Sequence, residues 1–197
     1  MRVTLFDYGA GNLHSLAKAL ATAPGVEVCV QEDPLRAIDT DLLVLPGVGA
    51  FGAAAARLEL GRDQMRQALE DGLPCLGICL GMQLMFDTSD EGGGWGLGFF
   101  RGRVTKLNSR RVPHIGWNSV EEDTALKSAK LGSVYYAHSF VCRAEEPGVV
   151  VGWTTHEEDR FPAAVRRGNV LGVQFHPEKS SAAGVRFVHA FLEEVRK

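Results

Sequence analysis

Short apolar runs alternate with helical repeats through the first half of the chain. Strands are predicted where β-branched and aliphatic residues cluster between turn residues, at Arg2–Phe6, Glu27–Gln31, Leu42–Leu45 and Pro74–Ile78. Apolar residues recur at helical spacing at Leu13–Ala23, at Gly52–Asp71 with an interruption near Gly61, and at Leu80–Phe86. This alternation predicts a parallel sheet covered by helices on both faces.

The pattern changes from about Phe99 onward. Short β runs dominate there, at Phe100–Leu107, Ser133–Val141, Val149–Thr155, Ala163–Arg167 and Val170–Phe175, and helical spacing returns only at Ala182–Val195. Asp90–Gly98 contains five glycines and is predicted to be a mobile surface loop. We find no internal repeat and no long linker. The prediction is one domain, 1–197, with a flavodoxin-like, mostly parallel α/β sheet and an antiparallel β extension in its C-terminal half.

Composition limits the partners and the cellular compartment that are expected, but it does not indicate a function. Apolar residues make up 45% of the 197 residues, and the net charge of −3 gives no reason to expect nucleic acid as a partner. The sequence has no run of 18 apolar residues, so no membrane span is expected, and Met1–Asp7 reaches a charge too early for a signal peptide. The four cysteines are therefore expected to be reduced thiols in a cytoplasmic protein, with Cys29 and Cys142 as packing residues.

Cys79 is the leading candidate for a catalytic residue. It lies between a predicted buried strand and a predicted helix, with Gly77 two positions before it and Gly81 two positions after it. A nucleophile elbow needs small residues at these two positions, because the sharp turn that exposes the nucleophile leaves no room for larger ones. The start of a helix behind the sulfur also favours the thiolate, which is the reactive form. For Cys75, by contrast, we expect a small buried hydrophobic residue.

His176 and Glu178 complete a candidate triad. They directly follow the apolar run Val170–Phe175, and Pro177 between them stiffens the turn. The imidazole would take the thiol proton and later return it to the leaving group, while the carboxylate would orient the ring and stabilise the imidazolium. The sequence therefore predicts a cysteine-dependent acyl-transfer enzyme.

Acyl transfer also requires hydrogen-bond donors for the developing oxyanion. The backbone N–H of Leu80 is one candidate, and Val48 or Gly49 should supply the second. Gly47 and Gly49 let the backbone approach a substrate or turn over. No Lys-Ser/Thr pair follows these glycines, so the segment is not a phosphate-binding P-loop. Because Asp7–Asn12, Pro46–Gly49, Cys79 and His176 all follow predicted strands, they should converge at one edge of the sheet.

A metal site is the competing interpretation of these residues. Cys75 and Cys79 could bind zinc with His114, His138 or His176, but no second Cys/His pair with ligand spacing is present. We therefore expect no metal and no cofactor. His14, His156 and His189 fit solvated or packing positions.

Several segments together resemble the class I, triad-type glutamine amidotransferases. The resemblance rests on Pro-Cys-Leu-Gly-Ile-Cys-Leu-Gly-Met-Gln at 74–83 and His-Pro-Glu at 176–178. Further segments resemble one branch of this family, the glutaminase subunits of imidazole glycerol phosphate synthase: residues 7–13, 46–51, 113–118, 135–140 and 176–180. Together they extend over essentially the whole chain. One departure is Phe140, where that branch more often has tyrosine.

The resemblance implies a reaction and a partner. Glutamine would be hydrolysed to glutamate and ammonia through a thioester on Cys79, in a site where Gly47, Gln83 and Glu91 bind the substrate with help from the Ser139–Phe140 backbone. The partner would be a cyclase subunit with a (βα)8 barrel, forming a heterodimer and using the ammonia in histidine biosynthesis. The residues implied at that interface are Asn12, Trp117, Tyr135 and Lys179.

Two alternatives are weaker. The glutaminase of pyridoxal phosphate synthesis has a similar size and triad, but it would show a different glycine-rich oxyanion segment and lack the run at 113–118. A flavodoxin-like binding module with a decayed site should have lost at least one of Cys79, His176, Glu178 or the oxyanion glycines. All of them are present.

Overall fold

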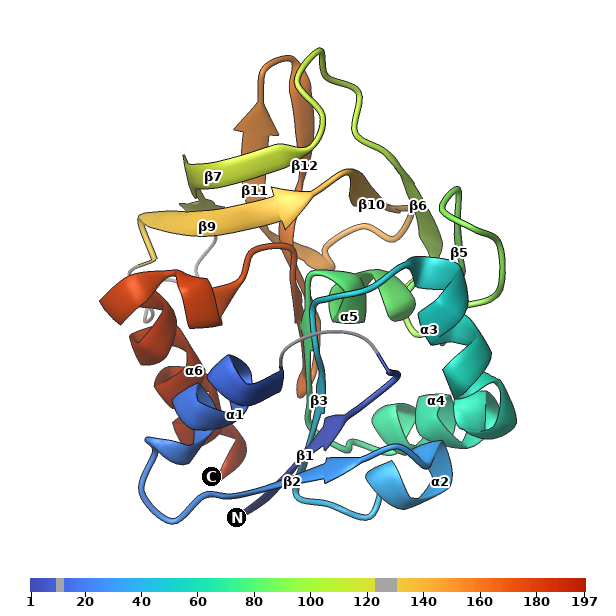
Figure 1. The fold of residues 1–197 in the computed structure, drawn as a ribbon, viewed down its shortest axis with the longest axis vertical. Helices are drawn as coiled ribbons and strands as arrows, with labels where there is room; N and C mark the ends of the chain where they lie inside the picture. The colour runs from blue at the N-terminus through green and yellow to red at the C-terminus, as the bar shows by residue number, and fades with distance from the viewer. Residues whose placement is uncertain (10–12, 123–130) are drawn as a thin grey trace.

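The main sheet has a parallel half and an antiparallel half. The computed structural model of the chain describes residues 1–9, 13–122 and 131–197. Within these residues the largest sheet has the strand order β2-β1-β3-β4-β13-β12-β11-β8 (Figure 1). Its first five strands are parallel: β2 (Glu27–Gln31), β1 (Arg2–Phe6), β3 (Leu42–Leu45), β4 (Cys75–Ile78) and β13 (Val170–Val173).

The remaining strands of this sheet are antiparallel. They are β12 (Asp159–Arg167), β11 (Val150–His156) and β8 (Glu121–Glu122). The predicted α/β class with an antiparallel extension in the C-terminal half is therefore confirmed. Boundaries differ in detail, because β12 begins four residues before the predicted Ala163 and β13 ends at Val173, two residues before the predicted Phe175.

Two smaller sheets lie beyond the carboxyl ends of the parallel strands. One has the order β10 (Phe140–Ala144), β6 (Gly102–Lys106), β5 (Thr88–Ser89), and the other pairs β7 (His114–Ser119) with β9 (Ser133–His138). The prediction of a single strand Ser133–Val141 was wrong. The chain passes from one sheet to the other at Ser139, and period-two alternation along one strand does not reveal a change of partner strand. β7 was not predicted as a strand.

Helices cover both faces of the main sheet. α1 (Leu13–Ala21) and α6 (Ser181–Val195) lie on one face, and α2 (Pro34–Ala37), α3 (Phe51–Leu58), α4 (Arg62–Glu70) and α5 (Leu80–Leu84) lie on the other (Figure 1). The predicted interruption at Gly61 is confirmed, since a short 3-10 turn, Glu59–Gly61, separates α3 from α4. A Cβ on Gly61 would lie 2.8 Å from the Cβ of Pro34, so α2 packs directly on this break.

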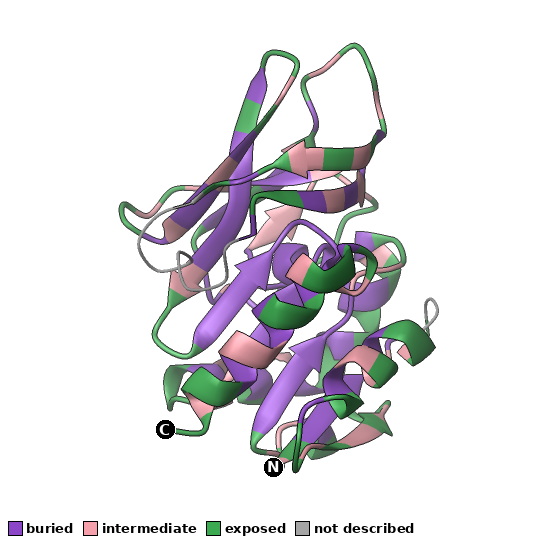
Figure 2. Cartoon of the chain, turned by 90° about the vertical axis from the view of Figure 1, so that its left-hand side faces the viewer, coloured by how far each residue is buried: buried purple, intermediate pink, exposed green. Residues whose placement is uncertain are grey.

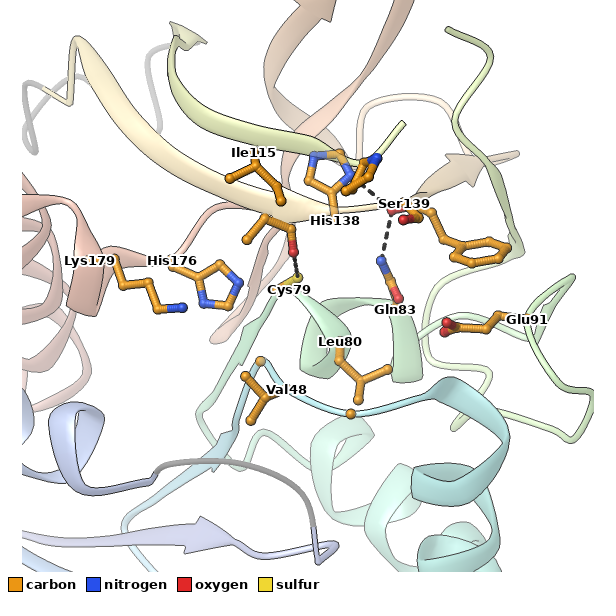
Figure 3. Close-up of a pocket in the computed structure, with 15 residues that line it drawn as sticks. Val48, Cys79, Leu80, Gln83, Glu91, Ile115, His138, Ser139, His176 and Lys179 are labelled. Atoms are coloured by element: carbon orange, nitrogen blue, oxygen red, sulfur yellow. Dashed lines mark hydrogen bonds between the residues drawn. The ribbon is translucent and has the colours of Figure 1, made fainter. Parts of the chain in front are cut away.

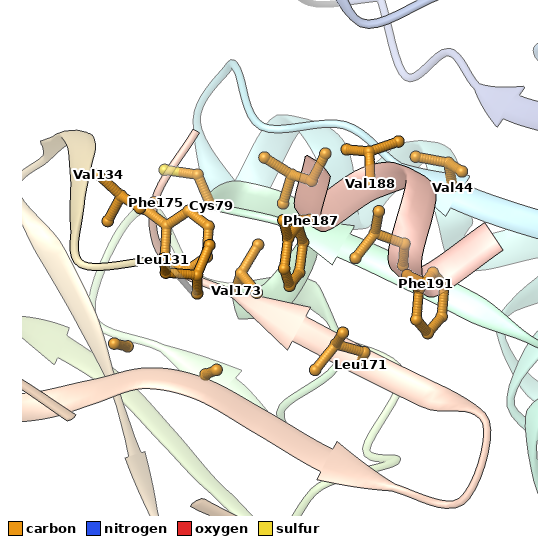
Figure 4. Packing of buried hydrophobic residues seen from close by; sticks show 14 of the residues in the cluster. Val44, Cys79, Leu131, Val134, Leu171, Val173, Phe175, Phe187, Val188 and Phe191 are labelled. Atoms are coloured by element: carbon orange, nitrogen blue, oxygen red, sulfur yellow. The ribbon is translucent and has the colours of Figure 1, made fainter. Parts of the chain in front are cut away.

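The core consists of two apolar layers separated by the sheet. Along β3, Leu42 and Val44 pack with α1 and α6, whereas Leu43 and Leu45 pack with α3, α4 and α5. Figure 2 shows the central strands buried along their length and the helices exposed on their outer sides. Figure 4 shows the first layer from nearby, with the aromatic rings of α6 packed over β13. A sheet buried on both faces explains why its strands are continuous apolar runs.

Gly184 in α6 connects this packing to the His-Pro-Glu turn. A Cβ at this position would lie 1.9 Å from the carbonyl oxygen of Pro177. We predict that Gly184→Ala lowers the free energy of unfolding by about 1–3 kcal/mol, because the helix must move away from the turn. Urea denaturation tests this. A helical Gly→Ala change without a clash would instead stabilise by about 0.5–1 kcal/mol, so a gain in stability would contradict the prediction.

Candidate active site

Cys79 is held on a strained turn between β4 and α5. Its backbone has φ 48° and ψ −102°, a conformation that residues other than glycine rarely adopt. The Cys79 N–H donates to the Val173 carbonyl oxygen at 2.7 Å, which anchors the turn to β13. The turn therefore has the geometry of a nucleophile elbow, and its strain is of the kind found at functional sites.

The two flanking glycines are required by close backbone contacts. A Cβ on Gly81 would lie 2.0 Å from the carbonyl oxygen of Leu45, at the end of β3. A Cβ on Gly77 would lie 2.8 Å from the carbonyl carbon and oxygen of Gly81. Any larger residue would force the strand and the helix apart. The glycine spacing in the sequence thus reflects how tightly α5 packs against β3 and β4.

His176 and Glu178 form a buried pair at the end of the neighbouring strand. His176 Nδ1 donates to Glu178 Oε1 at 2.8 Å, and the imidazole is almost fully buried. The backbone around the ring is fixed on both sides, because the His176 N–H donates to the Tyr135 carbonyl and Ser180 Oγ donates to the His176 carbonyl. Since Nδ1 carries the proton toward the carboxylate, Nε2 is the nitrogen left for the thiol.

The pKa of His176 is raised to about 10. Burial alone would lower it, but the hydrogen bond and charge of Cys79, followed by those of Glu178, outweigh the burial. A thiolate and an imidazolium side by side are the resting form of an activated cysteine.

With the exception of Glu178, the predicted catalytic, oxyanion and substrate-binding residues line one cavity of about 360 Å³ (Figure 3). Three neighbouring strands bring the candidate catalytic groups and the candidate oxyanion segment there: β3 leads into 47–49, β4 into Cys79 and Leu80, and β13 into His176. Gly47 touches the triad directly, since a Cβ there would lie 2.9 Å from His176 Cε1. Gly49 has φ 122°, a backbone conformation that side chains other than glycine strongly resist. Val48 also lines the cavity.

Apart from Gly47, the residues expected to bind the substrate lie on the side of the cavity away from His176 (Figure 3). Gln83, Glu91, Ser139 and Phe140 all line the cavity. Gln83 Nε2 donates to the Phe140 carbonyl at 2.9 Å, while one oxygen of Glu91 accepts from the Phe51 N–H at 3.0 Å, at the start of α3. Glu91 therefore belongs to the pocket wall even though it lies in the glycine-rich stretch expected to be a surface loop.

Three of the four residues implied at a partner interface form a connected strip. Trp117 on β7 is 53% exposed, and its ring meets Tyr135 on β9 edge-on at 6.1 Å between centroids. Lys179 Nζ lies 6.0 Å from the Tyr135 ring centroid. This strip, Trp117–Tyr135–Lys179, borders the cavity through Lys179. Asn12 lies outside the described residues.

The structure places four further polar residues in or near the site, of which His114 and His138 were considered above only as zinc ligands. Gln174 is fully buried and donates to Cys79 Sγ at 3.5 Å. His138 lines the cavity, and His114 lies directly behind it. Tyr8 is buried, and its pKa is raised by burial, by Cys79 and by Asp7. The one available signal was that Gln174 is a polar residue inside an apolar strand run.

Cys75 has a different environment from Cys79. It packs among the apolar residues of the α3–α5 layer, and burial raises the pKa of its thiol. Within residues 1–9, 13–122 and 131–197, no group of three or more His, Cys, Asp or Glu side chains could hold a metal ion.

Comparison with known proteins settles the family. The family description "Glutamine amidotransferase class-I" matches residues 4–195. The chain belongs to this family. It is 45% identical to the imidazole glycerol phosphate synthase subunit HisH of Symbiobacterium thermophilum over 95% of this chain and 91% of that protein. The HisH subunits of Aquifex aeolicus and Pyrococcus furiosus are 42% and 40% identical, with coverage of 96% or more of each chain. The resemblance to this branch is thus confirmed.

Solved structures show the same fold. A glutamine amidotransferase crystal structure covers 99% of this chain with a TM-score of 0.75 at 23% identity. The structure of PurLQS from Thermotoga maritima gives a TM-score of 0.75 at 19% identity. Among the helices of the described residues, none has the length and apolar character needed to cross a membrane.

The raised pKa of His176 gives a testable expectation. We predict that Cys79→Ala lowers this pKa from about 10 toward its ordinary value, because Cys79 is the largest contribution that raises it. Ring ¹⁵N NMR of both proteins between pH 5 and 11 measures the change. In the wild type, the protonated ring stabilises the fold most below pH about 6.5, and this contribution declines as the pH rises through about 10. An unchanged pKa in the variant would contradict the thiolate–imidazolium pair.

Proposed function

We propose that this chain is the glutaminase subunit of an imidazole glycerol phosphate synthase. It would hydrolyse L-glutamine to glutamate and ammonia and pass the ammonia to a cyclase subunit. The main supporting observation is that Cys79, on a strained elbow, lines the same cavity as His176, which is hydrogen-bonded to Glu178. The full-length similarity to HisH subunits supports the choice of synthase over other amidotransferases.

The chemistry proceeds in two halves. The Cys79 thiolate attacks the side-chain carboxamide carbon of glutamine and forms a tetrahedral oxyanion. The nitrogen then takes a proton from the His176 imidazolium as the C–N bond breaks. Ammonia departs, and a glutamyl thioester remains on Cys79. His176, now neutral, accepts a proton from water as the water attacks the thioester. Glutamate is released and the thiolate–imidazolium pair is restored. Glu178 keeps the ring oriented throughout.

The oxyanion would be stabilised by backbone donors. The Leu80 N–H starts α5 directly after the nucleophile, and Val48 or Gly49 supplies the second donor from the facing loop. Gly49 already has a positive φ, so a peptide rotation in this loop meets little steric resistance. The substrate's α-ammonium would lie against the Glu91 carboxylate, with Gly47, Gln83 and the Ser139–Phe140 backbone lining its path.

The need for a partner follows from the product. Ammonia in neutral water is mostly ammonium, which is not a nucleophile, so useful delivery requires a closed path to the next site. The Trp117–Tyr135–Lys179 strip exposes apolar surface and a cation beside the cavity. We propose that this strip, with Asn12, docks on a cyclase of (βα)8-barrel form as a heterodimer.

Cys79→Ala tests the nucleophile. In the complex with its cyclase, this variant should lower glutamine hydrolysis at least about 10⁴-fold, because no thioester can form. The same complex should still make imidazole glycerol phosphate from ammonium salts, more readily at alkaline pH where free ammonia rises. Glutamate and imidazole glycerol phosphate are both measured. His176→Ala should be comparably damaging, and Glu178→Gln should retain more activity. Near-wild-type hydrolysis in Cys79→Ala would refute the proposal.

Lys179→Glu tests the docking strip. Charge reversal beside Tyr135 should loosen the junction and let ammonia escape, so glutamate accumulates in excess of imidazole glycerol phosphate. The ammonium-dependent reaction should stay near normal. The ratio of the two products measures the leak, and Lys197→Glu at the distant C-terminus is the matched control (Figure 1). One glutamate per product in Lys179→Glu would show that this lysine is only a solvated side chain.

A further inference from the structure

A continuous row of hydrogen-bonded polar groups crosses the wall of the cavity. It runs from His114 on β7 through His138 on β9 to the carbonyl of Phe140 on β10, and continues through Gln83 and Gln174 to the sulfur of Cys79. The four polar side chains of this row are each at most 5% exposed: His114, His138, Gln83 and Gln174. Burying polar side chains is unfavourable unless they are paired, so a row of four invites a functional explanation.

The Phe140 carbonyl fixes the proton positions on its histidine side. A carbonyl only accepts, so His138 Nδ1, at 3.1 Å, must carry a proton. Burial, reinforced by His114, lowers the pKa of His138 to about 3, so the ring is neutral and its Nε2 is an acceptor. His114 Nδ1 therefore donates to it at 3.1 Å. Burial also lowers the pKa of His114, to about 4, which leaves its Nε2 as an acceptor for Asn118 at 3.4 Å.

The same carbonyl fixes the orientation of the two glutamines. Gln83 must present Nε2 to it, at 2.9 Å (Figure 3). The second N–H of this amide points to Gln174 Oε1 at 3.4 Å, so Gln174 must present its Nε2 to Cys79 Sγ, at 3.5 Å. Reversing either amide would set two acceptors or two donors against each other. One carbonyl thus decides the direction of every bond in the row.

We propose that Gln174 is a positioning residue for glutamine hydrolysis, which ends this row and orients both the Cys79 sulfur and the Gln83 amide. The inference rests on the proposed Cys79 chemistry. The side-chain N–H of Gln174 donates to the Cys79 sulfur at 3.5 Å and so stabilises the thiolate. The side-chain carbonyl of Gln174 accepts one N–H of Gln83, and the Phe140 carbonyl accepts the other. Only Gln83 Oε1 therefore remains for the substrate. Because this oxygen is an acceptor, it suits a donor group of the substrate such as its ammonium group.

Packing alone does not account for Gln174. The side chain is fully buried, and its backbone N–H is already satisfied by the Ala163 carbonyl at 2.9 Å. A methionine of the same length would fill the space without burying an amide. An amide is required only if both of its ends are used, one by Cys79 and the other by Gln83.

Two substitutions separate the two ends of the amide. Gln174→Met keeps the length and loses both the donor and the acceptor. Gln174→Glu keeps an oxygen for Gln83 but replaces the donor beside the sulfur by a carboxyl group. The matched control is Thr4→Val on β1. It removes a buried hydroxyl that lies 3.1 Å from another cysteine sulfur, that of Cys29 on β2, and neither residue lines the cavity.

The experiment has two readouts. One is the pH profile of Cys79 alkylation by iodoacetamide in the full chain, followed by mass spectrometry of the Cys79 peptide. The other is KM and kcat for glutamine in the complex with the cyclase. The other groups that act on the sulfur electrostatically, namely His176, Tyr8 and Cys142, are unchanged in every variant.

In both Gln174 variants the alkylation profile should move to higher pH, and a move of one unit lowers the rate at pH 7 about tenfold. The KM should rise up to about tenfold in Gln174→Met and stay within about twofold in Gln174→Glu, because only the latter still holds Gln83. Thr4→Val should change neither readout. A general loosening of the fold would not separate KM from the alkylation profile in this way.

Two results would overturn the inference. The first is an unshifted alkylation profile in both Gln174 variants. The second, which needs no variant, is a ring ¹⁵N spectrum of the wild type that shows His138 protonated at Nε2 instead of Nδ1. Failure of the proposed function is distinguishable from both, because it shows as glutamine hydrolysis that survives Cys79→Ala.

Discussion

The strained backbone at Cys79 is the constraint on which the rest of the site depends. A non-glycine residue at φ 48° costs about 1–3 kcal/mol and persists only where neighbours impose it. Here the Cys79 N–H is held by β13, and α5 is pressed so closely onto β3 that Gly81 has no room for a Cβ. The parallel sheet and its helix layer therefore maintain the strained backbone. This backbone conformation in turn fixes the position of the Cys79 sulfur.

The positions of the other groups follow from strand order. β3, β4 and β13 are neighbours in the sheet, so residues 47–49, Cys79 and the His-Pro-Glu turn emerge side by side at their carboxyl ends. Strands β7, β9 and β10 of the two smaller sheets complete the cavity wall, with His138 and Ser139 at the point where the chain changes sheets. The junction between two sheets thus supplies the wall opposite the triad.

Polar organisation in this wall is set by the Phe140 carbonyl. It accepts from His138 on one side and from Gln83 on the other, and neutral buried histidines cannot reverse the direction of the bonds. Pre-oriented dipoles of this kind need little rearrangement during a reaction. The substitution of phenylalanine for the tyrosine more usual in this branch leaves the carbonyl, and therefore the row, intact.

The amino-acid sequence was sufficient to predict the parallel strands, the break at Gly61 and the elbow at Cys79, because each depends on local periodicity or on glycines at fixed spacing. Three features became visible only in the folded chain, namely the contacts of Gln174, the exchange of sheets at Ser139 and the strand β7. In the sequence, Gln174 is only a single polar residue within an apolar run. Its hydrogen-bond partners Cys79 and Gln83 lie more than 90 residues away in the chain. Long-range pairing leaves no periodic trace in a sequence, since it depends on which strands become neighbours.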